Sequence, residues 1–175
     1  MNDRSKAQKI ALSGVLISLA VLFGTFSIPI GIAKVSPVQH FVNVVGAIIL
    51  GPIYAVINAF VTSMIRNMLG TGSLLAFPGS MIGALLAGIF YKKFRYLLSA
   101  SIGEIIGTGL LGALVSYPIA KIFLGKEGAV IMFIVPFTLS CSVGAIIAYL
   151  FLKVPVINNI LVKNQVNLNQ SKSTE

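Results

Sequence analysis

Six apolar runs separated by short breaks constrain the fold of this chain more than any other feature of its sequence. A helix that crosses a bilayer needs about 20 apolar residues, a length that the first, fifth and sixth runs reach. With 57% hydrophobic and only 10% charged residues, the chain is too apolar for a water-soluble fold of this size. We therefore predict an all-α integral membrane protein with six transmembrane helices. The runs span residues 10–30, 38–50, 53–69, 79–90, 97–119 and 130–152.

The second, third and fourth runs are shorter than a full crossing. They are bounded by Pro37, by the pair Gly51-Pro52 and by the glycine-rich segment GTGSLLAFPG. Short or interrupted helices are tolerated in a membrane where the surrounding protein covers their backbone. For the second and fourth runs, a tilted helix, a re-entrant helix and a helix partly covered by its neighbours all remain open alternatives.

The distribution of basic residues predicts the orientation of the helices. Cytoplasmic segments of membrane proteins carry an excess of Lys and Arg. If the N-terminus is cytoplasmic, most of the 13 basic residues fall inside. We therefore expect a membrane domain at 1–152 with both termini cytoplasmic, followed by a polar, frayed tail at 153–175. The inner residues are Arg4, Lys6, Lys9, Lys92, Lys93, Arg95, Lys153, Lys163 and Lys172; the outer ones are Lys34, Arg66, Lys121 and Lys126.

Several classes of function are disfavoured by the composition. No Walker A, HExxH, GxSxG or CxxC motif occurs, and the chain has one histidine and one cysteine. One cysteine excludes a thiolate metal cluster, and the want of a paired-carboxylate or multi-histidine cluster argues against an integral-membrane enzyme. The net charge of +9 lies in short patches between apolar runs, which indicates membrane topology rather than nucleic-acid binding. Cys141 is expected to be a small buried residue.

Polar side chains inside the second and third runs mark a candidate site, because such groups are costly in hydrocarbon. His40 and Asn43 share a helix face, and with Arg66 and Asn67 they are expected to meet in the outer half of the membrane. Snorkelling to the headgroups is the alternative for Arg66, and a hydrogen bond at the helix start is the alternative for His40. The third run also places Asn58 two turns and Thr62 one turn before Arg66.

Glu104 is the single acidic residue inside any of the apolar runs. It begins a ridge at four-residue spacing that continues through Thr108, Gly112 and Ser116. A buried carboxylate needs partners, so we expect Glu104 and Thr108 to bind a ligand; a position near the inner surface and a tie between helices are the alternatives. A pair between Glu104 and Arg66 is not expected, because the topology places them at opposite depths.

The first helix carries small residues at Ala7, Ala11, Gly14 and Ser18, which form one stripe. Such stripes allow helix backbones to approach closely in lipid. From the residues alone, packing inside the bundle is favoured over a docking face for another membrane protein.

Three blocks of the chain together resemble the ThiW family. They read PVQHFVNVVGAIILGPIYAVINAF, RNMLGTGSLLAFPGSMIGALLAG and GEIIGTGLLGALVSYP. The family consists of substrate-binding S components of energy-coupling factor (ECF) transporters, linked to the thiamine precursor hydroxyethylthiazole. The resemblance implies a six-helix S-component bundle in a bacterial-type cell membrane, with its pocket towards the outside. It also implies two kinds of partner, a membrane T component and two ATPase subunits that supply the energy.

The resemblance assigns roles to the candidate residues. On helix 1 it implies that Ala7, Ala11, Gly14 and Ser18 dock the T component, against the packing interpretation. For the ligand it suggests aromatic walls and a few polar groups, and it implies that no metal or cofactor is needed. The alternatives left open are another thiamine-related ligand (the pyrimidine moiety or thiamine) and a stand-alone small transporter. The expected substrate-binding residues are His40, Asn43, Arg66, Asn67, Phe77, Glu104, Thr108, Tyr117 and Ser140.

Overall fold

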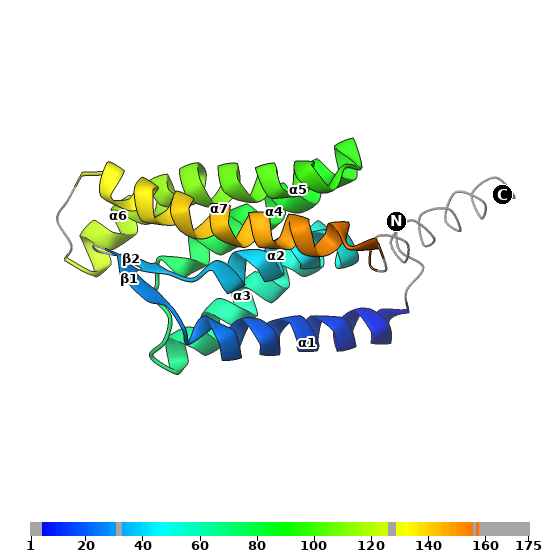
Figure 1. Ribbon diagram of the computed structural model, residues 1–175. Coiled ribbons are helices and arrows are strands. Elements are labelled where there is room, and N and C mark those ends of the chain that lie inside the picture. Colours follow the sequence, from blue (N-terminus) through cyan, green and yellow to red (C-terminus); the bar gives the residue numbers. More distant parts are fainter. Residues whose placement is uncertain (1–4, 31–32, 126–128, 156, 158–175) are drawn as a thin grey trace, which may run out of the picture.

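A computed structural model describes residues 5–30, 33–125, 129–155 and 157. Within them the chain forms six helical segments and one short β-hairpin (Figure 1). The fifth segment is continuous through α5, the π-helix η1 and α6. The elements are α1 (Lys6–Gly24), β1 (Ile28–Ile30), β2 (Ala33–Val35), α2 (Pro37–Leu50), α3 (Pro52–Met68), α4 (Ala76–Phe94), α5 (Leu97–Glu104), η1 (Ile105–Gly112), α6 (Ala113–Phe123) and α7 (Ile131–Lys153).

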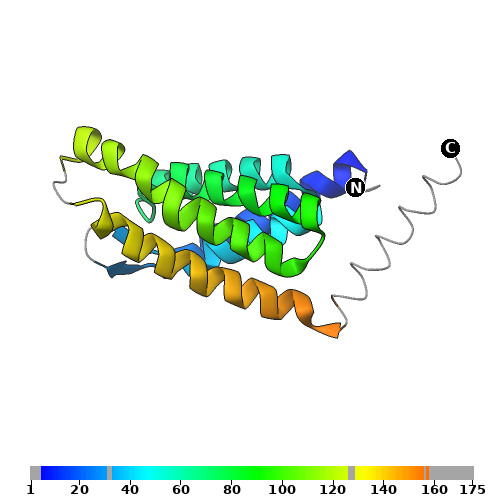
Figure 2. The same ribbon diagram turned by 90° about the horizontal axis from the view of Figure 1, so that it is seen from above.

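Successive helical segments run in alternating directions along one bundle (Figures 1 and 2). The β1–β2 hairpin, the α3–α4 loop and the end of α6 lie at one end, which we call the hairpin end. The start of α1, the α2–α3 turn, the α4–α5 turn and the end of α7 lie at the opposite end, which we call the terminal end. This arrangement places two chain segments far apart in sequence, the start of α1 and the end of α7, at the same end.

Three of the described helices are long and apolar enough to cross a membrane: α1, the continuous helix Leu97–Phe123 and α7. α2 is a shorter apolar helix. The helical, membrane-type fold is therefore confirmed, whereas the number of crossings and the side on which the termini lie stay predictions.

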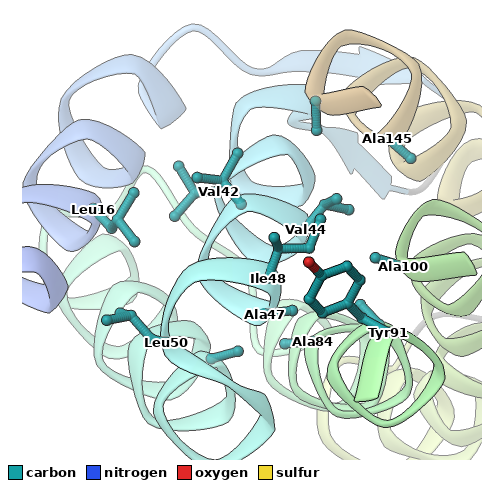
Figure 3. Packing of buried hydrophobic residues seen from close by; sticks show 14 of the residues in the cluster. Leu16, Val42, Val44, Ala47, Ile48, Leu50, Ala84, Tyr91, Ala100 and Ala145 are labelled. Carbon is teal, nitrogen blue, oxygen red and sulfur yellow. The ribbon is translucent and has the colours of Figure 1, made fainter. Parts of the chain in front are cut away.

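α2 is short because it is the central helix. Its 14 residues span about 21 Å, and ten of them are buried. Figure 3 shows Val44, Ala47 and Ile48 of α2 surrounded by side chains of other helices. A helix covered on all sides by protein does not need the length of one exposed to lipid. The labelled neighbours are Leu16 from α1, Ala84 and Tyr91 from α4, Ala100 from α5 and Ala145 from α7.

The first helix differs from its predicted span of 10–30. It begins at Lys6, where Ser5 and Gln8 form a capping box, and this local motif starts the helix before the apolar run does. It ends at Gly24, and Ile28–Ile30 pairs antiparallel with Ala33–Val35. Apolar character alone does not distinguish this short strand from the end of a membrane helix.

Other helix ends also lie beyond the apolar runs. α4 spans Ala76–Phe94 rather than 79–90, and it stops where Arg95 takes a left-handed conformation with φ 62°. The fifth segment continues to Phe123 instead of 119. Polar and basic residues can extend a helix past its apolar part, so hydropathy underestimates its length. Arg4, Lys126, Lys163, Lys172 and the tail from 158 lie outside the described residues.

α4 and the fifth segment pack closely through glycine. A Cβ atom on Gly107 of η1 would lie 2.7 Å from the Cα of Gly83 on α4. A real Cβ cannot approach so closely, and glycine is the residue that permits it. η1 is an eight-residue π-helix, a rare conformation that is frequent at functional sites.

Candidate functional site

A cavity of about 50 Å³ lies at the hairpin end of the bundle. It is bounded by the start of α2, the end of α3, the α3–α4 loop, the first turns of α4, η1 and α7. Most of its side chains are polar, although the bundle around it is apolar. The lining residues are Ser36, Gln39, His40, Arg66, Thr71, Gly72, Ser73, Leu75, Ala76, Gly79, Ser80, Thr108, Phe137 and Ser140.

Glu104 lies directly behind this cavity and is fully buried. Its Oε1 atom is 2.8 Å from His40 Nδ1, 3.1 Å from Asn43 Nδ2 and 2.9 Å from Thr108 Oγ1. Hydrogen bonds to this oxygen offset part of the cost of burying the carboxylate. We call these four residues the carboxylate cluster. Two of them, His40 and Thr108, also line the cavity, so the cluster forms its floor.

The carboxylate cluster can still form further hydrogen bonds. Thr108 Oγ1 lies 3.0 Å from Gly79 O as well as near Glu104, and its single hydrogen can serve one of the two acceptors. The Oε2 atom of Glu104 is buried and has no hydrogen-bond partner among the described residues. Buried polar atoms are usually paired, so this carboxylate can accept a further hydrogen bond.

Arg66 organises the opposite wall of the cavity. It is 3% exposed, and its Nη1 group donates to Gln39 Oε1 of α2. Its Nη2 group donates to Gly24 O at 2.7 Å and to Thr71 O at 3.4 Å. The guanidinium therefore joins the end of α1, the start of α2 and the α3–α4 loop. Snorkelling, the alternative for Arg66, does not describe a side chain that is buried among protein groups.

A chain of hydrogen bonds links the Arg66 wall to α4. Gln39 Nε2 donates to Ser63 Oγ at 3.0 Å, and Ser63 Oγ lies 3.1 Å from Ser80 Oγ. Asn43 Nδ2 donates to Ser80 O at 3.1 Å as well as to Glu104. The Arg66 wall and the carboxylate cluster are thus parts of one polar network.

Glycine makes room for the carboxylate cluster. A Cβ on Gly83 would lie 2.0 Å from Thr108 Oγ1 and 2.8 Å from both oxygens of Glu104. On the other side, a Cβ on Gly144 of α7 would lie 2.8 Å from His40 Cβ. Larger residues at either position would displace the cluster, which explains why polar groups can gather between helices that pack so closely.

The structure brings together most of the predicted substrate-binding residues. His40, Arg66, Thr108 and Ser140 line the cavity. Asn43 and Glu104 lie behind it, bonded to the lining residues described above. The Ser140 hydroxyl accepts a hydrogen bond from Ser36 N at 2.9 Å.

Three predicted residues lie elsewhere. Asn67 Nδ2 donates to Ser63 O and to Ser73 O, so it holds the α3–α4 loop. Phe77 packs against Phe60 with ring centroids 5.6 Å apart, and Tyr117 packs against Phe133 at 6.1 Å. Neither aromatic residue is among those that line the cavity.

Glu104 was expected at the opposite depth from Arg66, and that depth stays a prediction. Glu104 bonds directly to His40 and Asn43 of α2, the two residues expected to meet Arg66 in the outer half of the membrane. Among the described residues, the acid–base contact of Glu104 is with His40, at 2.8 Å, and not with Arg66.

Gln39, Ser36, Ser63 and Ser80 were missed from the sequence although they form part of the network. One signal was available: Gln39 lies four residues before Asn43, which is one turn on the same face. The serines gave no comparable signal, because serine is common in membrane helices and often bonds its own backbone. Cys141 is buried and free, as predicted.

The small-residue stripe on α1 faces away from the bundle. Ala7, Ala11, Gly14 and Ser18 are all exposed, and a Cβ on Gly14 would meet nothing within 4 Å. The opposite face, with Ser13, Leu16 and Ala20, is the buried one. Packing inside this bundle, the interpretation favoured from the residues alone, is therefore wrong.

Among the described residues, no group of three or more His, Cys, Asp or Glu side chains is placed to hold a metal ion. The chemistry available at the cavity is hydrogen bonding and charge, supplied by hydroxyls, amides, one guanidinium and the His40–Glu104 pair. Such a site can select and hold a small polar molecule.

Comparison with known proteins gives one match. A family model described as "Thiamine-precursor transporter protein (ThiW)" matches residues 10–156, most of the chain. No curated protein and no solved structure shows significant similarity to it.

Proposed function

The chain belongs to the ThiW family of thiamine-precursor transporter proteins, and on this premise we propose that it is the substrate-binding S component of an ECF transporter. In this role it captures hydroxyethylthiazole from outside the cell and delivers it inward. Its partners are a membrane T component and two ATPase subunits, and its location is the cell membrane of a bacterial-type cell.

The observation that carries this proposal is the small polar cavity inside an apolar bundle. A cavity of about 50 Å³ exceeds the roughly 10–15 Å³ that one water molecule needs, so it has room for a small ligand. Hydroxyethylthiazole has one ring nitrogen that accepts hydrogen bonds and one hydroxyl that both donates and accepts. Small-molecule sites combine apolar walls with a few placed polar groups, and Phe137 and Leu75 supply such walls here.

Each predicted site residue then has a role. His40, Arg66, Thr108 and Ser140 contact the ligand. Asn43 and Glu104 hold His40 and Thr108 in position through the carboxylate cluster. Asn67 supports the loop that covers the cavity, while Phe77 and Tyr117 support its surroundings through their ring contacts.

The orientation that fits uptake places the hairpin end outside and both termini in the cytoplasm, with six crossings. Basic side chains gather at the terminal end, as expected for a cytoplasmic surface. Substrate enters at the α3–α4 loop, and reorientation of the bundle against the T component, driven by ATP hydrolysis in the ATPases, releases it inside. The basic residues near the terminal end are Lys6, Lys9, Lys92, Lys93, Arg95 and Lys153.

The exposed stripe on α1 is the proposed docking face for the T component. Four small side chains on a lipid-facing helix leave its backbone open to close approach by another helix. Replacing Ala11 with Leu should abolish ATP-driven uptake and leave ligand affinity unchanged. Uptake by this chain alone, in vesicles without ATP, would instead identify a stand-alone transporter.

Isothermal titration of the purified protein in lipid nanodiscs with hydroxyethylthiazole tests the ligand. We expect saturable binding, and we expect the pyrimidine moiety and thiamine to compete weakly. Absence of both heat and thermal stabilisation at millimolar hydroxyethylthiazole would refute the assignment. Stronger binding of the pyrimidine moiety or thiamine would mean that this compound, rather than hydroxyethylthiazole, is the ligand of the S component.

A further inference from the structure

Two helices begin at the wall of the cavity. α2 has 14 residues and starts beside Ser36, whose side chain makes no capping hydrogen bond. α4 has 19 residues and starts beside Leu75; the N–H groups of Ala76 and Phe77 already donate to Ser73 O and Leu74 O, so α4 contributes its dipole rather than free donors. Residues from the first turns of both helices line the cavity, among them Gln39 and Ala76. The N-terminal end of a helix carries a partial positive charge, and uncapped ends favour anions.

Arg66 adds a full positive charge to the same wall. Its guanidinium donates hydrogen bonds to neutral oxygens, on Gln39, Gly24 and Thr71. Among the described residues, no carboxylate forms an ion pair with it. A buried cation without a counter-ion is costly, and an anion in the cavity would neutralise it.

Two buried donors at the cavity also lack partners. Among the residues that the structure describes, the hydroxyl of Ser36, which is 7% exposed, has no hydrogen-bond partner, and neither has Nε of Arg66, which is 3% exposed. Arg66 Nε packs near Gly24, whereas Ser36 stands at the uncapped start of α2. A native structure rarely leaves such groups unpaired. An acceptor supplied by a ligand would satisfy the Ser36 hydroxyl.

From these observations we propose that the cavity receives an oxyanion, so that its preferred ligand is a thiazole precursor carrying a phosphate or carboxylate group rather than the neutral alcohol. This rests on the proposed function and concerns the same site. Arg66 contributes a charge of +1 at the wall of the cavity. The oxyanion accepts hydrogen bonds from Ser36 and the Arg66 wall, while the ring lies against Leu75 and Phe137.

Titration in nanodiscs with three probes tests this inference: hydroxyethylthiazole, its phosphate monoester and a thiazole carboxylate. Hydrogen bonds to a charged group contribute more than neutral ones, so at least one anionic probe should bind about tenfold more tightly than the alcohol. Comparison of the two anionic probes identifies which oxyanion is favoured. Equal or tighter binding of the alcohol would overturn the inference and leave the proposed function intact, whereas failure of all three probes would overturn both.

A matched pair of variants tests whether the preference for an anionic ligand depends on Ser36. Ser36→Ala removes the unpartnered hydroxyl at the cavity, and Ser13→Ala removes another buried, unpartnered hydroxyl on α1 that does not line it. Ser36→Ala should weaken the anionic probe several-fold and the alcohol less, while Ser13→Ala should change neither affinity. An unchanged anion affinity in Ser36→Ala, or an equal loss for both probes, would count against the proposal.

Arg66→Gln provides a second measurement. It removes the charge and keeps hydrogen-bonding capacity, so the anionic probe should lose its advantage over the alcohol. Retention of the full preference by a folded Arg66→Gln protein would contradict the inference. If that variant fails to fold, the Ser36 and Ser13 pair decides.

Discussion

The two halves of α2 lie in different environments. Its second half, with Val44, Ala47 and Ile48, is packed among apolar side chains of four other elements (Figure 3). Its first half, with Gln39, His40 and Asn43, is equally buried but bonded to polar groups on α3, α4 and α5. We call these the apolar half and the polar half.

The difference separates two requirements of a binding protein in a membrane. Apolar packing there depends on shape, because lipid is as apolar as the side chains it would replace. A polar network specifies one arrangement, because any loss leaves a buried group unpaired. The apolar half therefore contributes stability without ligand specificity, and the polar half contributes specificity at some cost in stability.

The largest effect is expected at Gly83, because both the apolar half and the polar half of α2 depend on close packing of the helices around them. Gly83→Ala introduces a Cβ that would overlap Thr108 Oγ1 and crowd Glu104. It should destabilise the protein by about 3 kcal/mol and abolish binding, as measured by thermal unfolding and titration. Gly14→Ala, in open space on α1, is the control and should leave both unchanged. A stable Gly83→Ala protein with normal affinity would show that the carboxylate cluster is not rigid.

The next effect tests the apolar half alone. Leu50 at the end of α2 is 4% exposed, and Leu50→Ala should lower the free energy of unfolding by about 2 kcal/mol through the cavity it leaves. Affinity should stay the same, because the residue is remote from the polar network. Leu150→Ala, on the exposed face of α7, should have no measurable effect on either. A large loss of affinity in Leu50→Ala would mean that the two halves are energetically coupled.

A smaller effect tests the polar half. Glu104→Gln retains the shape and one acceptor oxygen but loses the charge that three donors surround. Affinity should fall about tenfold, with a modest change in stability. Asn43→Ala should act in the same direction, since Asn43 bonds both Glu104 and Ser80. If titration shows unchanged affinity in both variants, the ligand lies outside this network.

The smallest effect concerns the link between Gln39 and α4. Ser63→Ala removes the hydroxyl that joins Gln39 to Ser80, which leaves Gln39 Nε2 without that partner. We expect a cost of about 1 kcal/mol in stability and a change in affinity of several-fold or less. Ser99→Ala provides the comparison, because it removes a hydroxyl at the start of α5 that donates to a neighbouring backbone carbonyl. An effect of Ser63→Ala as large as that of Glu104→Gln would mean that Arg66 is positioned mainly through this link.

Apolar runs predicted each helical segment, because the need to satisfy the backbone in lipid leaves few other structures. They predicted the ends less well: capping at Ser5 and the left-handed Arg95 are local signals that hydropathy does not register. For the site, the rarity of His40, Arg66 and Glu104 in apolar surroundings was enough to single them out. Gln39 shares a helix face with Asn43, but Ser63 and Ser80 required the three-dimensional contacts between α2, α3 and α4, which spacing along single helices does not contain. Phe77 was predicted to bind the substrate because it is aromatic, but its ring packs against Phe60.

The π-helix between Glu104 and Ala113 has a consequence for the side chains on either side of it. A π turn contains about one residue more than an α turn, while each residue of an α-helix advances the side chains by about 100°. If the same residues of η1 formed α-helical turns instead, each would advance the helix by a larger angle, and Ser116, which donates to Leu75 O at 3.3 Å, would rotate relative to Glu104. The π conformation of η1 thus sets the angular phase between the carboxylate on the floor of the cavity and the loop at its rim.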